Sequence, residues 1–436
     1  MGRNFSDWVV ASSEATTESK IPLIYRRWAA ISAVAGAMGR KCWYDQGEYK
    51  IRPNLYVVLI GPPGSGKTLS LQLPYNEVFS ALTEPFEPTE YERAEARLLW
   101  QRYVPLTAPL YLLSDKATDV KIGHCMSLVS HDTSMLSVKH QDQMDDSSIT
   151  VMTEEFGTLM SRAHDDLHIL LTRMWDAGRP YDHQTRHSKS HRVKGPCLNW
   201  IACATPQQFI DRMPEDAGEQ GLLTRIIPVV YDGPDIGITA KNKRSYDHHY
   251  VEALRYDLGQ IATIGGEFDW EDRTLLAKVQ AWLDAGQPPA PTEPCMGPWR
   301  QRRHAQVIKV AMVLSAARNH GRIITNADWE DALHLIVEVE KSMPSVLARF
   351  GRTEVGRITD LLLQYVEKKG GKIRTAELKR EAARMVRNPG DVHTTIELMK
   401  ESGMIEPIGE TFVRAMKPRG ETPSATIPIV PKQAAV

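Results

Sequence analysis

The chain has 436 residues, with 53 Lys and Arg against 54 Asp and Glu, which gives a formal net charge of −1. That length exceeds one compact core and predicts about two to four domains. The balanced charge excludes a protein that is basic throughout, so any nucleic-acid site must be a local patch. The five cysteines form no C-x-x-C pair and no His-linked metal spacing, which argues against zinc and fits a reducing compartment.

Membrane segments are not expected in this chain. No apolar stretch approaches the ~20 residues that cross a bilayer, and the N-terminus lacks the apolar segment of a signal peptide. The sequence therefore predicts a cytoplasmic protein without a membrane partner.

The apolar pattern predicts an α/β protein. Residues 21–38 read as a helix, and 41–44 as a short strand that can pair with 49–51. After them, short apolar runs alternate with helical patterns, which is typical of a mostly parallel sheet with helices on both faces. These runs are 55–60, 110–113, 149–152, 198–204 and 226–231.

Composition also suggests how the chain divides. We expect a helical N-terminal region, an α/β core, a connecting segment, a helical lid, a small C-terminal module and a disordered tail. The connecting segment is polar and rich in Pro and Gly, with one helix at 270–284, and the tail has the composition of a disordered segment. The expected bounds are 1–50, 51–232, 233–298, 299–350, 351–416 and 417–436.

Residues Gly61 to Thr68 read G-P-P-G-S-G-K-T, a complete Walker A phosphate loop. The loop follows an apolar strand and precedes a helical pattern. Backbone N–H groups and the positive end of that helix would hold phosphates, Lys67 would add a charge, and the Thr68 hydroxyl would bind Mg²⁺. The sequence thus predicts ATP and Mg²⁺ as cofactors, with the nucleotide at Gly61, Pro62, Pro63, Gly64, Ser65, Gly66, Lys67, Thr68 and Leu69.

A phosphate loop needs an acidic partner at the end of a neighbouring strand. The run 149–155 ends in Glu154 and Glu155, which would hold Mg²⁺ and polarise the attacking water, respectively. Glu in the first position departs from the usual hydrophobic-Asp-Glu form. Asp115, which also follows an apolar run, is the alternative, but a pair of carboxylates matches the two tasks better.

The next apolar strand ends at Thr205, whose side chain could contact the attacking water or the γ-phosphate. Asn199 takes that role if the strand register differs. Farther on, Arg225 opens another apolar strand. In a ring ATPase such an arginine reaches the nucleotide of a neighbouring subunit. Arg212 is the reserve candidate for that contact.

Residues 179–194 read R-P-Y-D-H-Q-T-R-H-S-K-S-H-R-V-K, a basic segment in an otherwise neutral chain. Alternation on either side of Ser188 to Ser190 predicts a hairpin with its basic side chains near the tip. A solvated charged loop is the simpler interpretation from composition alone. The position of the segment, between the acidic strand and Thr205, favours a function.

The order of these features resembles AAA+ ATPases of the pre-sensor-1 hairpin clade, which includes minichromosome-maintenance and superfamily 3 viral helicases. Tyr25 to Trp28, Pro53 to Leu55 and Gly221 to Arg225 resemble more closely a group of helicase-like ATPases encoded by phages and mobile elements. The resemblance spans roughly 20–345, although only Walker A is specific by itself. It implies an AAA+ core with a parallel sheet, and a homo-hexameric ring.

The resemblance also implies roles for further residues. Arg302 stands seven residues before Lys309, as a phosphate-contacting lid arginine does in minichromosome-maintenance proteins, with Arg303 as its alternative. The hairpin would project into the ring pore and grip DNA phosphates without sequence preference. The residues implied in that contact are Arg186, His187, Lys189, His191 and Arg192.

The C-terminal module predicts three helices, 354–369, 375–385 and 391–402, followed by two short strands around Gly409. That order is typical of a winged helix. Its basic flank consists of Arg374, Lys379, Arg380, Arg384 and Arg387. Such modules bind duplex DNA or proteins, and the sequence leaves both open.

The sequence therefore predicts an ATP-dependent, ring-forming DNA helicase or translocase, serving replication of a phage or mobile element with other replication proteins as partners. A AAA+ switch, which is a loader, regulator or remodeler that hydrolyses ATP without unwinding, is the alternative. A defence or transposition factor with the same core is a third.

Overall fold

The computed structural model describes most of the chain in two compact units, Met1–Gly351 and Arg352–Val436, each with its own buried core. The described residues are 2–15, 20–84, 86, 110–114, 118–129, 131–132, 145–160, 167–178, 180–183, 191–213, 221–233, 246–348, 359, 362–363, 365–385, 391–401, 404–408 and 412–415. No helix among them is long and apolar enough to cross a membrane.

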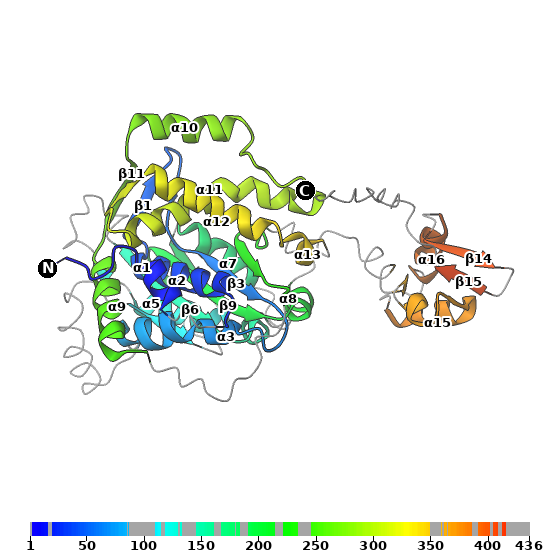
Figure 1. The fold of residues 1–436 in the computed structure, drawn as a ribbon. Coiled ribbons are helices and arrows are strands. Elements are labelled where there is room, and N and C mark those ends of the chain that lie inside the picture. The colour runs from blue at the N-terminus through cyan, green and yellow to red at the C-terminus, as the bar shows by residue number, and fades with distance from the viewer. Residues whose placement is uncertain are drawn as a thin grey trace, which may run out of the picture. The chain divides into compact units, whose positions relative to one another are not determined.

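A central sheet of five parallel strands organises the first unit (Figure 1). The parallel sheet predicted from the apolar runs is confirmed. β3 and β10 are buried along their whole length, because helices cover both faces. In sheet order the strands are β10 (Ile226–Val230), β3 (Tyr56–Ile60), β9 (Pro196–Ala204), β6 (Asp145–Thr153) and β4 (Leu112–Ser114), and β5 (His131–Asp132) pairs antiparallel with β6.

Adjacent residues of β9 show what covers each face. Asn199 donates a hydrogen bond to the Ser32 carbonyl of α2 (Leu23–Met38), at 3.0 Å. Trp200, on the other face, stacks on Phe156 of α6 (Phe156–Leu159). α2 is almost wholly buried, and Gly36 lets it approach β6, since an added Cβ would lie 2.4 Å from the Thr150 hydroxyl.

The remaining helices of this unit complete both layers. α1 packs on α2 and α9, whereas α7 packs on β9, and the long helices α11 and α12 pack on each other. Their bounds are α1 (Trp8–Glu14), α3 (Lys67–Ser70), α5 (Asp119–Leu128), α7 (Leu167–Asp176), α8 (Pro206–Arg212), α9 (His248–Ile261), α10 (Arg273–Asp284), α11 (Gly297–Ala317), α12 (Asn326–Glu340) and α13 (Pro344–Leu347). A π-helical segment, η1 (Gln72–Phe79), and short 3₁₀ turns, η2 (Ser80–Leu82) and η5 (Pro294–Met296), connect them.

A second, four-stranded sheet has the order β12 (Ile323–Ile324), β11 (Gly266–Trp270), β1 (Cys42–Asp45) and β2 (Lys50–Ile51). The predicted pairing of β1 with β2 is confirmed, with Tyr44 opposite Ile51. In the segment 233–298 the sequence predicted one helix, whereas the structure also has α9 and β11. The alternating burial of β11, with Phe268 and Trp270 inside, explains this strand, which pairs with β1.

The parallel strands give the central sheet two distinct edges. We call the strand starts, marked by Asn54, Pro196 and Arg225, the amino edge, and the strand ends, marked by Gly61 and Thr205, the carboxyl edge. Along β9 the eight steps from Pro196 to Ala204 separate the two edges by about 26 Å.

The second unit contains α15 (Thr375–Met385), α16 (Asp391–Glu401) and an antiparallel sheet in the order β13 (Lys372–Arg374), β15 (Phe412–Ala415) and β14 (Ile405–Ile408). The second and third predicted helices and the two terminal strands are present, and in the first, predicted at 354–369, residues 359, 362–363 and 365–368 are helical. β13 adds a strand that the sequence did not predict. Leu378, Ile396 and Val413 lie in its core. The predicted tail, 417–436, lies outside the described residues.

Candidate functional site

The phosphate loop begins where β3 ends, at the carboxyl edge. Gly64 and Gly66 have φ angles of 79° and 83°, a left-handed conformation that a side chain would strain. Gly66 precedes α3, which starts at Lys67. The glycine turn between a buried strand and a helix start is the backbone conformation that the predicted phosphate loop requires.

Tyr25 of α2 contacts the phosphate loop and the end of β3, a role that the sequence did not indicate. Its hydroxyl donates a 2.6 Å hydrogen bond to the Ile60 carbonyl and also interacts with the Ser65 hydroxyl. Burial raises the pKa of Tyr25, so the hydroxyl keeps its proton. Gly61 fits closely against it, because an added Cβ would lie 2.2 Å from the Tyr25 oxygen.

Lys67 lies over the loop that it follows. Its ammonium donates to the carbonyls of Gly61 (2.8 Å) and Pro62 (2.7 Å) and to the Ser65 hydroxyl (3.2 Å). These contacts keep the charge above the glycine turn. Thr68 and Leu69 are exposed on the same helix start.

The end of the acidic strand lies beside the loop. In the sheet register Thr153 of β6 is opposite Ala202 of β9, and Ala204 is opposite Ile60. Glu154 and Glu155 follow at once and are both exposed. The structure thus brings Glu154 to the edge that carries Lys67.

Cys203 of β9 is a buried thiol whose pKa is influenced by the neighbouring groups of the candidate site. Burial raises the pKa of its thiol to about 12, and the Glu154 carboxylate raises it further, whereas the Lys67 charge and a hydrogen bond with Thr68 act in the opposite direction. Lys67, Thr68 and Glu154 therefore all lie near enough to influence the charge of one buried side chain. Asp115, the alternative to Glu154, lies outside the described residues.

A Mg²⁺ ion fits this arrangement. Among the described residues no group of three or more His, Cys, Asp or Glu side chains could hold a metal by itself. Thr68 and Glu154 supply two oxygen ligands, and Mg²⁺ commonly takes the others from water and phosphate.

Thr205 lies next to the loop, since the Gly61 N–H donates to the carbonyl of the preceding Ala204, at 3.2 Å. Its hydroxyl accepts from the Gln208 N–H at 3.1 Å and caps α8. Asn199 is excluded as its alternative. That side chain is buried toward the amino edge, where its oxygen accepts from the Leu55 N–H at 3.0 Å.

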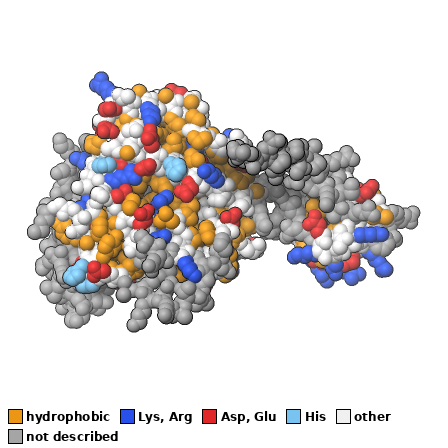
Figure 2. Space-filling view, in the orientation of Figure 1, with side chains coloured by type: hydrophobic (Ala, Val, Ile, Leu, Met, Phe, Trp, Pro, Cys, Tyr) orange, Lys and Arg blue, Asp and Glu red, His pale blue; other side chains and the backbone are white. Residues whose placement is uncertain are grey.

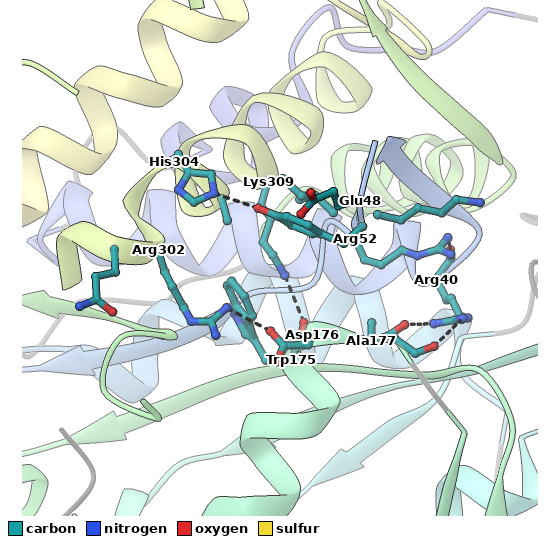
Figure 3. A pocket seen from close by; sticks show the side chains of 15 residues that line it. Arg40, Glu48, Arg52, Trp175, Asp176, Ala177, Arg302, His304 and Lys309 are labelled. Atoms are coloured by element: carbon teal, nitrogen blue, oxygen red, sulfur yellow. Dashed lines mark hydrogen bonds and ion pairs between the residues drawn. The ribbon is translucent and has the colours of Figure 1, made fainter. Parts of the chain in front are cut away.

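Arg225 and Arg302 are not brought to the phosphate loop of their own chain. Both contact Asp176 at the amino edge, at 2.8 Å and 3.3 Å, respectively. Figure 3 shows the contact of Arg302 with Asp176. The Arg225 side chain is 5% exposed and also donates to the Gly221 carbonyl. An arginine that reaches a neighbouring subunit has to be exposed, whereas the Arg225 side chain is buried in its contact with Asp176.

The two alternative arginines differ from each other. Arg303 is fully buried and forms a 2.6 Å ion pair with Glu340, so a role as phosphate contact is wrong for it. Arg212 ends α8, is exposed, and lies against Gly157, two residues beyond Glu155. It is therefore an exposed arginine at the carboxyl edge.

The predicted basic hairpin is present as a pair of antiparallel strands, β7 (Tyr181–His183) and β8 (His191–Val193), with His183 opposite His191. The candidates His191 and Arg192 belong to β8. Arg186, His187 and Lys189 lie outside the described residues.

No protein-family model matches the chain, and no curated protein matches it. Its function therefore has to be inferred from its own residues.

Proposed function

We propose that the chain is a Mg²⁺-dependent AAA+ ATPase that forms a ring and moves along DNA. The observation that carries the proposal is that Lys67, Thr68 and Glu154 lie at one edge of the central sheet, beside Cys203 of β9, where β3 ends in a complete Walker A loop. A glycine turn without a function would not need an acidic strand end and a supporting tyrosine beside it.

In this proposal the carboxyl edge carries the hydrolysis. The loop N–H groups and Lys67 bind the β- and γ-phosphates, and Thr68 with Glu154 holds Mg²⁺, which would neutralise charge on the phosphates. Glu155 accepts the proton of the attacking water, and Thr205 orients that water. Tyr25 keeps the loop in the conformation that binds phosphate.

Ring formation needs an arginine that reaches the nucleotide of a neighbouring subunit. The exposure of Arg212 supports it for this role over Arg225, whose guanidinium is held by Asp176. Arg302 has no part in phosphate binding at the carboxyl edge, because it lies with Arg225 at the opposite edge.

DNA contact is proposed for the basic hairpin, through residues 186–192. The C-terminal unit supports a second contact, since its helices and antiparallel strands are compatible with a winged helix. Figure 2 shows Lys and Arg side chains gathered along one margin of this unit. The exposed basic residues of the described part of this unit include Arg374, Lys379, Arg380 and Arg384.

The test measures ATP hydrolysis with and without single-stranded DNA and then the unwinding of a forked duplex. Stimulated hydrolysis with unwinding is the expected result. Stimulation without unwinding would favour the AAA+ switch, and a chain that remains monomeric in sedimentation with an ATP analogue and DNA would refute the ring.

A further inference from the structure

A cavity of about 780 Å³ opens at the amino edge (Figure 3). The phosphate loop lies at the other end of the strands, at the carboxyl edge. Arg40, residues 48–52 in and around β2, residues 175–178 at the end of α7, and α11 between Gln301 and Lys309 form its walls. Its size lies in the range of ligand sites, ~300–1,000 Å³. We call it the amino-edge pocket, and its charged lining residues are Arg40, Glu48, Lys50, Arg52, Asp176, Arg302 and Lys309.

Cations outnumber acids in this pocket by five to two. One of the two acids, Asp176, already holds Arg302 and Arg225. The other, Glu48, is exposed to water. The interior of the pocket therefore has an excess of positive charge, which attracts an anion.

Arg52 is one of three buried basic side chains in this pocket, at 4% exposure. Within the described part of the chain no carboxylate lies at ion-pair distance from it. Its guanidinium donates to the Arg40 carbonyl and lies 5.2 Å from the Trp43 ring centre. Burial and the neighbouring Arg40 lower the pKa of Arg52 to about 10. A buried charge is costly unless an opposite charge accompanies it, so an anion beside Arg52 would stabilise this arrangement.

Lys309 provides a second buried charge between the two ends of the pocket (Figure 3). Its ammonium lies 3.7 Å from the ring centre of Trp175 and donates to both oxygens of Asn54, at 2.9 Å. Arg302 lies on the same indole, 5.6 Å from its centre. Cations thus extend from Arg40 and Arg52 through Lys309 to Arg302.

The basic hairpin starts at the rim of this pocket. Trp175 to Gly178 line the pocket, and β7 begins at Tyr181, only three residues later. Arg40 fixes this junction, because it donates to the carbonyls of Ala177 and Pro196, the latter at 3.3 Å at the start of β9. A strand of nucleic acid held along the hairpin would pass the cationic pocket at its base.

We propose that the amino-edge pocket binds the phosphate backbone of the single-stranded DNA that the hairpin holds. This inference rests on the proposed function. The phosphates lie against Arg302, Lys50 and the Arg40–Arg52 pair, and the contact is independent of base sequence, since these groups recognise only charge and phosphate geometry.

The test compares full-length chains in their affinity for a labelled thymidine oligonucleotide, by fluorescence anisotropy across a range of salt. The test variant is Arg302→Gln with Lys50→Gln. Its control is Arg300→Gln with Lys341→Gln, which removes the same charge from exposed positions outside the pocket. Thermal unfolding of both variants checks that they are folded.

We expect the test variant to bind about tenfold more weakly and to lose about 0.7 unit of salt slope per lost phosphate contact, the value for single strands. The control should bind like the wild type. Equal affinity and slope in the test variant would overturn the pocket proposal, whereas a wild type that binds no DNA would overturn the proposed function itself. Pyrophosphate binding to a Lys67→Ala chain provides a further check. If the pocket substitutions abolish this pyrophosphate binding while DNA binding persists, the pocket is a small-molecule site and the proposal is overturned.

Discussion

Tyr25→Phe tests whether the phosphate loop is held in shape from α2. The substitution removes the hydroxyl that bonds the Ile60 carbonyl at 2.6 Å and interacts with Ser65. The Ile60 carbonyl keeps a second partner, the Tyr231 N–H at 2.8 Å, so no buried acceptor is left unpaired. The expected loss is then that of one ordinary hydrogen bond, about 0.5–1.5 kcal/mol.

Because the lost bond orders the loop, part of this energy should appear in nucleotide binding. A change of about 1 kcal/mol corresponds to a roughly fivefold weaker Kd for ATP. Tyr75→Phe is the matched control. It removes an equally buried hydroxyl, which lies 2.8 Å from the Ser32 hydroxyl of α2, the helix that carries Tyr25. Calorimetry of ATP binding and thermal unfolding of both variants provide the measurement.

Both variants should lose similar stability, but only Tyr25→Phe should lose affinity. Equal Kd values for Tyr25→Phe and the wild type would refute the view that Tyr25 preorganises the loop. Equal losses of ATP affinity in Tyr25→Phe and Tyr75→Phe would refute it as well.

Three other changes separate local roles. Gly61→Ala should abolish ATP binding, because its Cβ would lie 2.2 Å from the Tyr25 oxygen and 2.9 Å from the backbone oxygen of Tyr231; a variant that binds ATP like the wild type would contradict this close fit. Arg212→Ala should slow hydrolysis by about 100-fold or more at unchanged stability, whereas Arg225→Ala should lower the melting temperature because it breaks the contact with Asp176; the opposite pattern would return the finger role to Arg225. Burial lowers the pKa of Lys309 to about 7, below its unfolded value. Between these two pKa values the unfolded chain holds one more proton than the folded chain, so folding stability rises with pH. Below pH 7 both states are protonated, and the folded chain bears the full cost of the buried charge. Urea unfolding should therefore show a larger gain from pH 7 to pH 8.5 in the wild type than in Lys309→Met, and equal gains would contradict the shift.

Local sequence was sufficient to predict the parallel core and the phosphate loop. The buried run of β3 and the glycines after it carry their signal within a few residues. The pairing of β1 with β2 and the hairpin of β7 with β8 were also predictable, since each pair is close in sequence. β11 was missed because it pairs with β1, more than 200 residues earlier, and polar neighbours conceal its alternation.

The direction in which a helix presents its side chains was less predictable. The spacing of seven puts Arg302 and Lys309 on one face of α11, and both do line one pocket. That pocket is at the amino edge, because the packing of α11 on α2 and α12, rather than its own sequence, sets where the face points. Likewise nothing in the local sequence around Tyr25 indicates that its hydroxyl meets a carbonyl 35 residues later.

The most direct test of the central claim is the ATPase rate, with and without single-stranded DNA, of the wild type and of Glu154→Gln. The wild type should hydrolyse ATP in a Mg²⁺-dependent reaction that DNA accelerates. Glu154→Gln should still bind ATP but hydrolyse it at least about 100-fold more slowly. A wild type without ATPase activity, or a Glu154→Gln variant that retains the full rate, would contradict the proposed site.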